Sequence, residues 1–191
     1  MSTFNIIHNN SNRKYGTASL VKVSLPSEDV ILHHSGRIIL LNIGEATIGN
    51  FDLPSGTDAA SKIGCERFCG ETIPNLLVNS KFHGIIGGDW NYITSKDDCN
   101  RHTEAKMSPC LKRLIREFSW SDTFRHLYPN TTHFSHYYGN MRHGEGATSI
   151  DRSYSFGDLI PIEASYVSVA FSDHLSYITQ VKLPSPISSM L

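Results

Sequence analysis

Two short strings in the sequence combine residue types that could act on an anionic oxygen. The first, Gly87-Gly88-Asp89-Trp90-Asn91, follows the apolar pair Ile85-Ile86 and is typical of a buried strand that opens into a loop. In extended backbone, the side chains of Asp89 and Asn91 would point to the same face. The carboxylate could orient water or bind a cation, and the amide NH₂ could donate to a phosphate. The paired glycines allow close backbone approach or a positive φ.

The second string, Ser172-Asp173-His174, supplies another carboxylate and an imidazole, whose charge changes near neutral pH. A third string, Ser149-Ile150-Asp151-Arg152, lies between the other two in the sequence. Its Asp151 could hold the imidazole of His174 in one tautomer, as the carboxylate does in catalytic triads. Each string alone is also common in turns. All three in this order, each beside a strand-like run, indicate a catalytic site.

The identity, order and spacing of these strings resemble the endonuclease/exonuclease/phosphatase superfamily, which has the DNase I-like fold. Within it, the chain is most similar to the endonuclease domain of LINE-type retrotransposon polyproteins. The resemblance extends from about Tyr15 to about Lys182, and two further segments contribute to it, Tyr15–Lys22 and Asn50–Thr57. It implies an α/β fold, a layered sandwich of two packed mixed β-sheets flanked by helices.

The resemblance also implies a role for each candidate residue. Asp89 and Asn91 would lie at the scissile phosphate, with Asp89 activating or orienting water. Asp151 would orient His174, which would bind the phosphate together with Asn91. Asp173 would help to bind a divalent metal, either Mg²⁺ or Mn²⁺. The implied substrate is DNA and the implied location of a functional protein is nuclear, whereas protein partners are not indicated.

Two departures from the family pattern affect these expectations. Family members begin with a strand that carries an asparagine and a second strand whose Gln-Glu-type motif supplies a principal metal ligand. The first acidic residue of this chain is Glu28. The family string Asn-Ile-Tyr reads Asn50-Phe51-Asp52 here, so a carboxylate replaces a tyrosine hydroxyl that would contact phosphate. We therefore expect one domain over residues 1–183 that lacks its first strands, followed by a tail over 184–191.

Two functional hypotheses follow. The first is a divalent-metal phosphodiesterase, a DNA endonuclease of retrotransposon origin, that is weakly active or inactive. Its metal would be weakly held, because Mg²⁺ requires near-octahedral oxygen ligation and one carboxylate is a poor site. The alternative is a nonenzymatic remnant that keeps residual affinity for nucleic acid or has no function. Metal-dependent nicking of supercoiled plasmid would discriminate between them.

The composition limits the remaining classes. The 191 residues are 39% hydrophobic, which predicts a packed core and excludes global disorder. The net charge of −1 gives little general attraction for nucleic acid. The N-terminus lacks the apolar core of a signal peptide, and no apolar run approaches the roughly 20 residues that span a bilayer, so we expect an intracellular, non-secreted protein without membrane contact. The four cysteines lack the spacing of a zinc site and are expected to be partly buried, reduced thiols.

Local patterns predict the elements that position these residues. A turn at Gly44-Glu45 predicts a hairpin between the strands that flank it. Asp58 predicts the start of a helix towards Leu77, with a kink or restart at Pro74. A second helix is expected to start at Ser108-Pro109 and to bury Leu111, Leu114, Ile115 and Phe118. The expected strands are 17–23, 37–43, 46–53, 85–88, 133–138, 149–154, 166–169 and 175–181.

Overall fold

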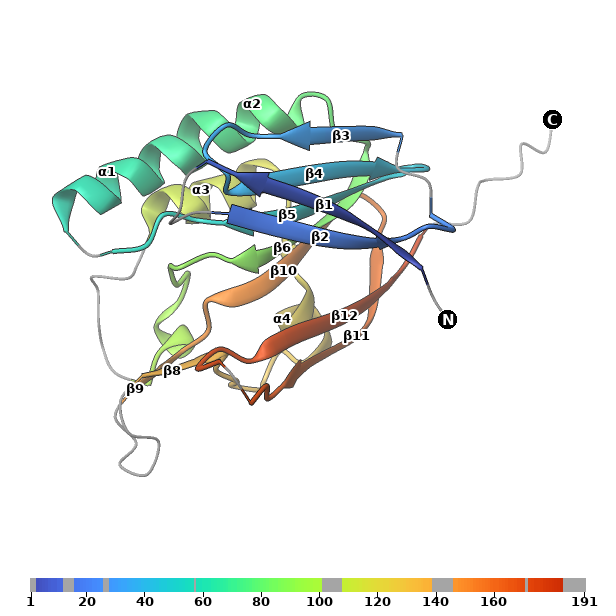
Figure 1. Cartoon of the computed structure of the whole chain (residues 1–191). Helices are drawn as coiled ribbons and strands as arrows, with labels where there is room; N and C mark the ends of the chain where they lie inside the picture. Colours follow the sequence, from blue (N-terminus) through green and yellow to red (C-terminus); the bar gives the residue numbers. More distant parts are fainter. Residues whose placement is uncertain are drawn as a thin grey trace.

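A six-stranded mixed sheet forms the centre of the protein. The computed structural model describes residues 3–11, 16–25, 28–56, 58–100, 108–138, 146–170 and 172–183. The sheet has the order β3-β4-β5-β6-β10-β7, and β5 and β6 form its parallel pair (Figure 1). Its strands are β3 (Asp29–Leu32), β4 (Ile38–Ile43), β5 (Ala46–Asp52), β6 (His83–Asp89), β7 (Ser121–Asp122) and β10 (Asp151–Phe156).

Three antiparallel hairpins complete the β structure. They are β1 (Phe4–Asn10) with β2 (Gly16–Lys22), β8 (His136–Tyr138) with β9 (Gly146–Thr148), and β11 (Ile160–Val167) with β12 (Ser176–Lys182). β2 contacts β4 and β5, whereas β12 contacts β10. The two longer hairpins therefore lie over opposite halves of one face of the sheet, with β6 between them.

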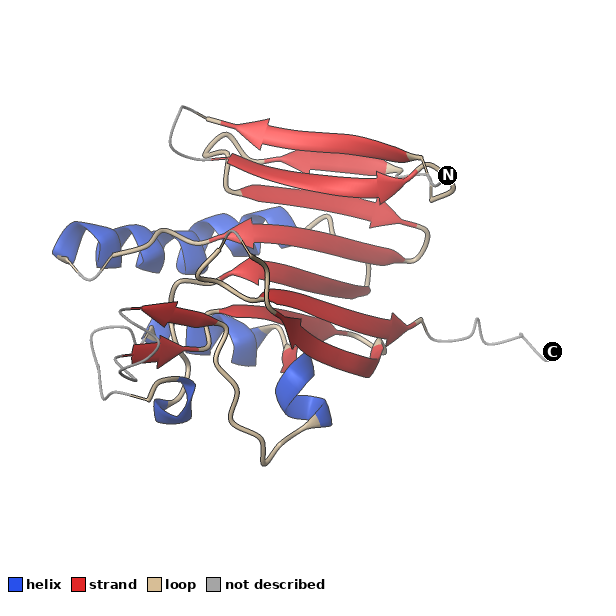
Figure 2. Ribbon diagram, turned by 60° about the horizontal axis from the view of Figure 1, so that its bottom comes forward, coloured by secondary structure: helices blue, strands red, loops and turns tan. Residues whose placement is uncertain are grey.

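The other face of the sheet is covered by helices, as Figure 2 shows. Alternate strand residues point to each face, so Ile38, Leu40 and Phe51 point towards the helices, whereas Ile39 and Leu41 pack against Val21 of β2. The helices that supply the rest of the main core are α1 (Ala59–Arg67), a π-helical turn (Phe68–Thr72), α2 (Ile73–Leu77) and α3 (Pro109–Glu117). A fourth helix, α4 (Thr123–Leu127), packs against β10 and β11.

The sequence predicted the fold class and the main elements correctly. The Asp58 carboxylate caps α1 by accepting from the backbone NH of Ser61, and Ser108 caps α3 through Leu111. Near Pro74, where a kink or restart was expected, a π-helical turn over Phe68–Thr72 joins α1 to α2 without a gap. Cys65, Cys69 and Cys110 are buried free thiols, and Cys99 is a partly buried one.

Several elements differ from the expectation. β11 begins six residues before the expected Tyr166, and β8 begins three residues after the expected His133. The elements that were not predicted are β1, β3, β7, β9, α4 and a 3₁₀ helix at Lys96–Asp98. The predicted tail, 184–191, lies outside the described residues. Among the residues that the structure describes, none of the helices has the length and apolar character needed to cross a membrane.

Candidate active site

The site begins where the parallel strands β5 and β6 end. Gly88 pairs with Phe51, and its φ is +144°, so this position requires glycine's backbone freedom. A Cβ on Gly88 would lie 1.8 Å from the carbonyl oxygen of Phe51. Trp90, directly after β6, is fully buried and donates its indole NH to the carbonyl of Arg152 at 3.2 Å. These contacts fix the chain on both sides of Asp89.

The backbone turns sharply after Asp89. Asn91 has a φ of +55°, so it is not extended as the sequence suggested. Its backbone NH donates to Oδ1 of Asp89 at 2.8 Å, a local bond that stabilises the turn. Its side-chain Nδ2 donates to the carbonyl of Leu53 at 2.8 Å and lies 3.5 Å from Oδ1 of Asp52. Asn91 therefore lies beside Asp89, and its side chain is held by Asp52 and Leu53 at the end of β5.

Asp151 and His174 form a direct pair. Nδ1 of His174 lies 2.9 Å from Oδ2 of Asp151, the arrangement expected for a carboxylate that orients an imidazole. Asp151 sits opposite Asp89 in the antiparallel pairing of β10 with β6. The hydroxyl of Ser135 accepts from the backbone NH of Asp151 at 2.9 Å, and Ser135 is fully buried. Ser135 is a positioning residue that the sequence analysis did not identify.

The closeness of two carboxylates changes the acidity of Asp89. Burial raises the pKa of Asp89 to about 6, and the neighbouring charge of Asp151 adds to this increase. The hydrogen bond from the backbone NH of Asn91 and the nearby His174 act in the opposite direction. A carboxyl group with a pKa near 6 can exchange protons close to neutral pH, which suits a general base.

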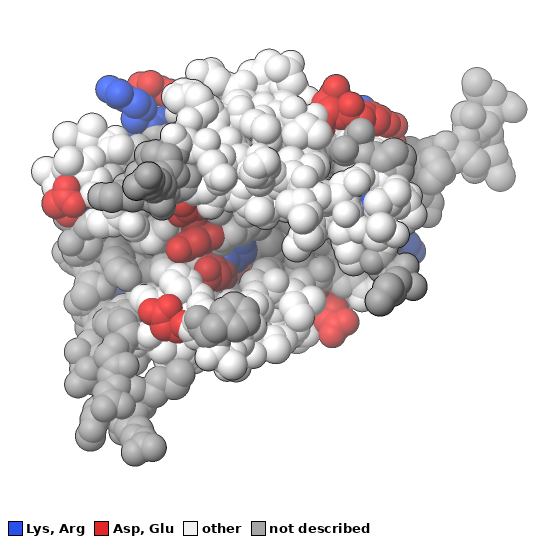
Figure 3. Space-filling model, viewed as in Figure 1, with Lys and Arg blue, Asp and Glu red and all other residues white. Residues whose placement is uncertain are grey.

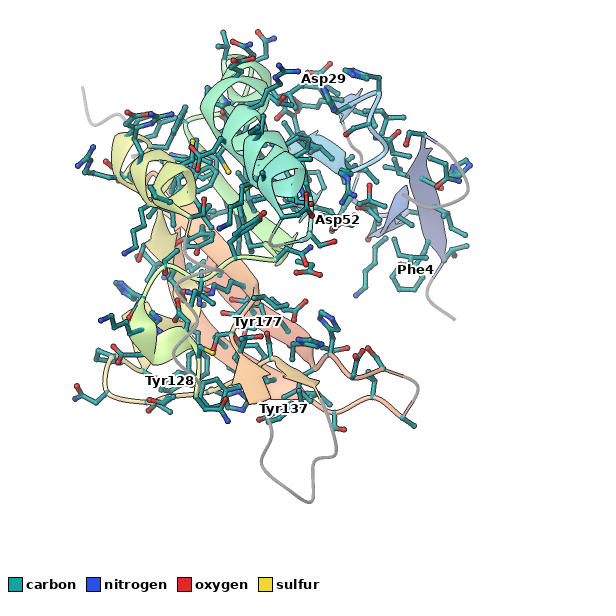
Figure 4. The ribbon with its side chains drawn as sticks, turned by 90° about the vertical axis from the view of Figure 1, so that its left-hand side faces the viewer. Phe4, Asp29, Asp52, Tyr128, Tyr137 and Tyr177 are labelled. Atoms are coloured by element: carbon teal, nitrogen blue, oxygen red, sulfur yellow. The ribbon has the colours of Figure 1, made fainter. Side chains whose placement is uncertain are left out.

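Asp52 stands where the family pattern has a tyrosine, and its carboxylate forms an ion pair with the guanidinium of Arg37. Nη1 of Arg37 lies 2.7 Å from Oδ2 of Asp52, and the Arg37 side chain is only 11% exposed. Burial raises the pKa of Asp52, while the charge of Arg37 lowers it. Figure 4 labels Asp52 at the end of β5 and Tyr177 on β12, on opposite sides of the opening in this view. Asp52 thus adds a carboxylate to the rim of the site, and Arg37 partly compensates its charge.

Asp173 lies on the other side of His174. Its carboxylate is exposed, and its Oδ2 lies 3.4 Å from Nε2 of His136. Hydrogen bonding with its own backbone, together with His136, lowers the pKa of Asp173. His136, on β8, lies against His174 with ring centroids 4.3 Å apart and ring planes tilted by 33°. The sequence analysis missed His136, because only the through-space pairing of its strand with the His174 segment brings it here.

Asp89 and Asp151 line a cleft of about 420 Å³ on the face that carries the two long hairpins, together with Leu175, which follows His174 in the chain. Its floor includes Ile48, Ile85, Asp89 and Asp151 from the central sheet, and its wall includes Tyr177 of β12. In Figure 3 acidic side chains gather in the hollow of this face. The six candidates therefore form one connected series from Asp52 through Asn91, Asp89, Asp151 and His174 to Asp173.

Part of this series fits a divalent cation. Carboxylate oxygens of Asp89 and Asp151 and a ring nitrogen of His174 lie within 4.8 Å of one another. Oδ1 of Asp89 accepts from the backbone NH of Asn91, and Oδ2 of Asp151 contacts His174, so both carboxylates are held in place at this group. Divalent cations such as Mg²⁺ and Mn²⁺ prefer oxygen ligands of this kind. Burial and the charge of Asp151 raise the pKa of Asp89, and a bound cation would favour its ionised form.

Comparison with solved structures identifies similar folds. An AP endonuclease from Archaeoglobus fulgidus superposes with a TM-score of 0.80 at 16% identity, over 94% of this chain and 80% of the other. The 3′ phosphatase NExo from Neisseria, bound to a product DNA hairpin, gives a TM-score of 0.78 at 13% identity, again over 94% and 80%. The 3′-5′ exonuclease NExo from Neisseria meningitidis gives 0.72 at 14% identity with the same coverage.

At these identities the similarity shows the fold, which is the DNase I-like α/β sandwich. No protein-family model matches the sequence, and no curated protein matches it.

Proposed function

We propose that this chain has the fold of a divalent-metal-dependent phosphodiesterase and hydrolyses DNA with low activity. We also propose that it derives from the endonuclease of a LINE-type retrotransposon. The observation that carries the proposal is the group formed by Asp89, Asp151 and His174, in which Asp89 ends a parallel strand pair and Asp89 and Asp151 line a cleft. The fold is shared with an AP endonuclease and with a 3′ phosphatase bound to DNA, which supports DNA as the substrate. A functional protein would then act in the nucleus.

The proposed reaction is the attack of water on a phosphate diester. Asp89 accepts a proton from the water, since its pKa of about 6 leaves it mostly ionised at neutral pH. The new bond joins the water oxygen to phosphorus while the ester bond to the leaving oxygen breaks. His174, oriented by Asp151, donates a hydrogen bond to a phosphate oxygen. A bound divalent cation, Mg²⁺ or Mn²⁺, would supply positive charge against the charge that develops on the phosphate.

The contacts of Asn91 explain why we propose low activity. Its amide has two NH donors, one directed to the carbonyl of Leu53 and the other towards Asp52. Binding of a phosphate oxygen by Asn91 must therefore replace the contact with Asp52. The Asp52 carboxylate also adds negative charge where a substrate anion would approach. In addition, the ligand group of Asp89, Asp151 and His174 contains no glutamate among the residues that the structure describes, so we propose that the cation is weakly held.

A nicking assay tests the proposal. Supercoiled plasmid is incubated with purified protein and Mg²⁺ or Mn²⁺, and with a chelator as the blank. We expect slow nicking that needs the cation and is lost in Asp89→Asn but retained in Asp158→Asn, which changes an exposed carboxylate on the β10–β11 turn. Equal nicking by the wild type and Asp89→Asn would refute the proposed site. A fusion that supplies strands with the asparagine and the glutamate is expected to raise the rate.

The alternative of a nonenzymatic nucleic-acid-binding remnant makes a different prediction. Such a protein would bind DNA without a cation. The net charge of −1 and the carboxylates of the cleft oppose that behaviour. Cation-independent DNA binding without any nicking would favour this alternative.

A further inference from the structure

A second group of ligand-type side chains lies beside the proposed active site and shares one residue with it. One ring nitrogen each of His136 and His174 and a carboxylate oxygen of Asp173 lie within 4.8 Å of one another. We propose that His136, Asp173 and His174 form a binding site for a transition-metal ion of the zinc class. The inference does not depend on DNA hydrolysis, because it concerns metal binding alone.

The backbone holds these three residues in place. His136 and His174 face each other across an isolated antiparallel β-bridge. The backbone NH of Tyr137 donates to the carbonyl of Asp173 at 3.2 Å, and that of Leu175 donates to the carbonyl of Ser135 at 2.6 Å. Two chain segments that are distant in sequence are thus joined on both sides of the group. A site on such a fixed support needs little rearrangement to bind an ion.

The distance between His136 and Asp173 fits tetrahedral coordination. Zinc bonds to imidazole nitrogen and carboxylate oxygen are roughly 2.1 Å long, so two ligand atoms of a tetrahedral site lie about 3.4 Å apart. Nε2 of His136 and Oδ2 of Asp173 are 3.4 Å apart. The side chains are also accessible from solvent on one side, because the Asp173 side chain is 69% exposed.

The contact between Asp151 and His174 adds an independent argument. A histidine that binds a metal through one ring nitrogen generally donates its other NH to a carboxylate or carbonyl, which fixes the ring. Nδ1 of His174 lies 2.9 Å from Asp151, so its Nε2 is the nitrogen that remains for a metal. Asp151 would act here as a positioning residue.

The donor set determines which metal is preferred. Two imidazoles and one carboxylate suit Zn²⁺, Co²⁺ or Ni²⁺, whereas Mg²⁺ prefers six oxygen ligands. Three protein ligands also leave one coordination position open, as in catalytic zinc sites. The group therefore differs in metal preference from the carboxylate pair of Asp89 and Asp151, and we expect excess Mg²⁺ not to displace the ion.

The first test is a zinc titration of the whole, chelator-stripped chain against a chromophoric competitor, with Mg²⁺ in large excess. We expect one tightly bound ion per chain. His136→Asn and Asp173→Asn should each weaken binding at least tenfold, and Asp151→Asn should weaken it by about tenfold, the usual effect of losing an outer hydrogen-bond partner. The matched control is His126→Asn, which changes an exposed histidine on α4 and should leave the affinity unchanged.

The second test needs no variant and so does not depend on how each variant folds. Paramagnetic Co²⁺ should broaden the NMR ring signals of His136 and His174 in the wild type before those of the other histidines. Unchanged zinc affinity in His136→Asn, or broadening that begins at other histidines, would overturn the proposal. So would zinc binding that is lost in Cys99→Ser but kept in His136→Asn, since the ion would then be held by a thiol.

Discussion

Replacement of Asp89 by asparagine should stabilise the protein at neutral pH although it removes the proposed base. The Asp89 carboxyl has a pKa of about 6 in the folded protein against an ordinary value of 3.8, chiefly because of burial. Between these values the folded state holds a proton that the unfolded state has released, so the stability due to this group falls as the pH rises from about 4 to about 6. Asparagine keeps the shape and the acceptor for the NH of Asn91 but does not ionise.

The magnitude follows from the two pKa values. The stability difference between Asp89→Asn and the wild type should grow from about 0.5 kcal/mol at pH 4 to about 3 kcal/mol at pH 7. Urea unfolding of both proteins across this range, with a chelator present, measures the difference. Carboxyl groups far from Asp89 are common to both proteins and therefore cancel, whereas Asp151 and Asp52, whose charges act on Asp89, are the groups that do not.

Asp158→Asn is the matched control, and its stability difference from the wild type should stay near zero at every pH. A divalent cation that binds Asp89 should reduce the difference at pH 7, because it stabilises the ionised form of the wild type. A difference that does not change with pH, or a variant that is less stable than the wild type at pH 7, would refute the argument that Asp89 is an uncompensated buried charge.

Three further outcomes are expected. Asp98→Asn should lower the free energy of unfolding by roughly 3–5 kcal/mol in urea titrations, because Asp98 is fully buried and pairs at 2.7 Å with the buried guanidinium of Arg152, whereas Asp97→Asn next to it should have little effect. Asp52→Tyr should leave plasmid nicking close to the slow rate of the wild type, since it restores a phosphate contact without a metal ligand; strong cation-dependent nicking by this variant would show that Asp52 alone blocks the reaction. The wild type should self-associate in concentration-dependent light scattering, because Leu20 on β2 is 68% exposed among other apolar side chains of the two long hairpins. Leu20→Lys should reduce the self-association, and a wild type that stays monomeric at high concentration would contradict the prediction.

The elements that could be predicted from the sequence are those with a strong local signal. The turn at Gly44-Glu45 between two β-branched runs identifies the β4–β5 hairpin, and Ser108-Pro109 identifies the start of α3. β1 has polar residues on both faces, so its sequence does not alternate between apolar and polar residues. α4 has only five residues, too few to show helical periodicity. β11 carries Pro161 and a bulge next to it, which obscure alternation.

In the candidate site, too, some residues have a local sequence signal and others do not. The strings around Asp89, Asp151 and His174 are local, and the structure places these residues together. The assignment of Asp173 as a metal ligand stays a prediction, and the structure adds His136 as its neighbour. The pairing of Arg37 with Asp52 depends on the register between β4 and β5, and the approach of His136 to His174 depends on an isolated bridge. Contacts of this kind follow from the tertiary fold and leave no local pattern in the sequence.

The negative charge near the cleft affects both the binding of metal ions and the approach of DNA. Asp89 and Asp151 line the cleft, and Asp52 lies beside Asn91 near it, where the nearly buried Arg37 compensates its charge. A polyanion therefore gains little from this surface until a cation reduces its negative charge. Since His174 belongs to both ligand groups, an ion held with His136 and Asp173 would occupy the imidazole that the hydrolytic proposal assigns to phosphate. The two sites should then compete, and zinc should inhibit any nicking that magnesium or manganese supports.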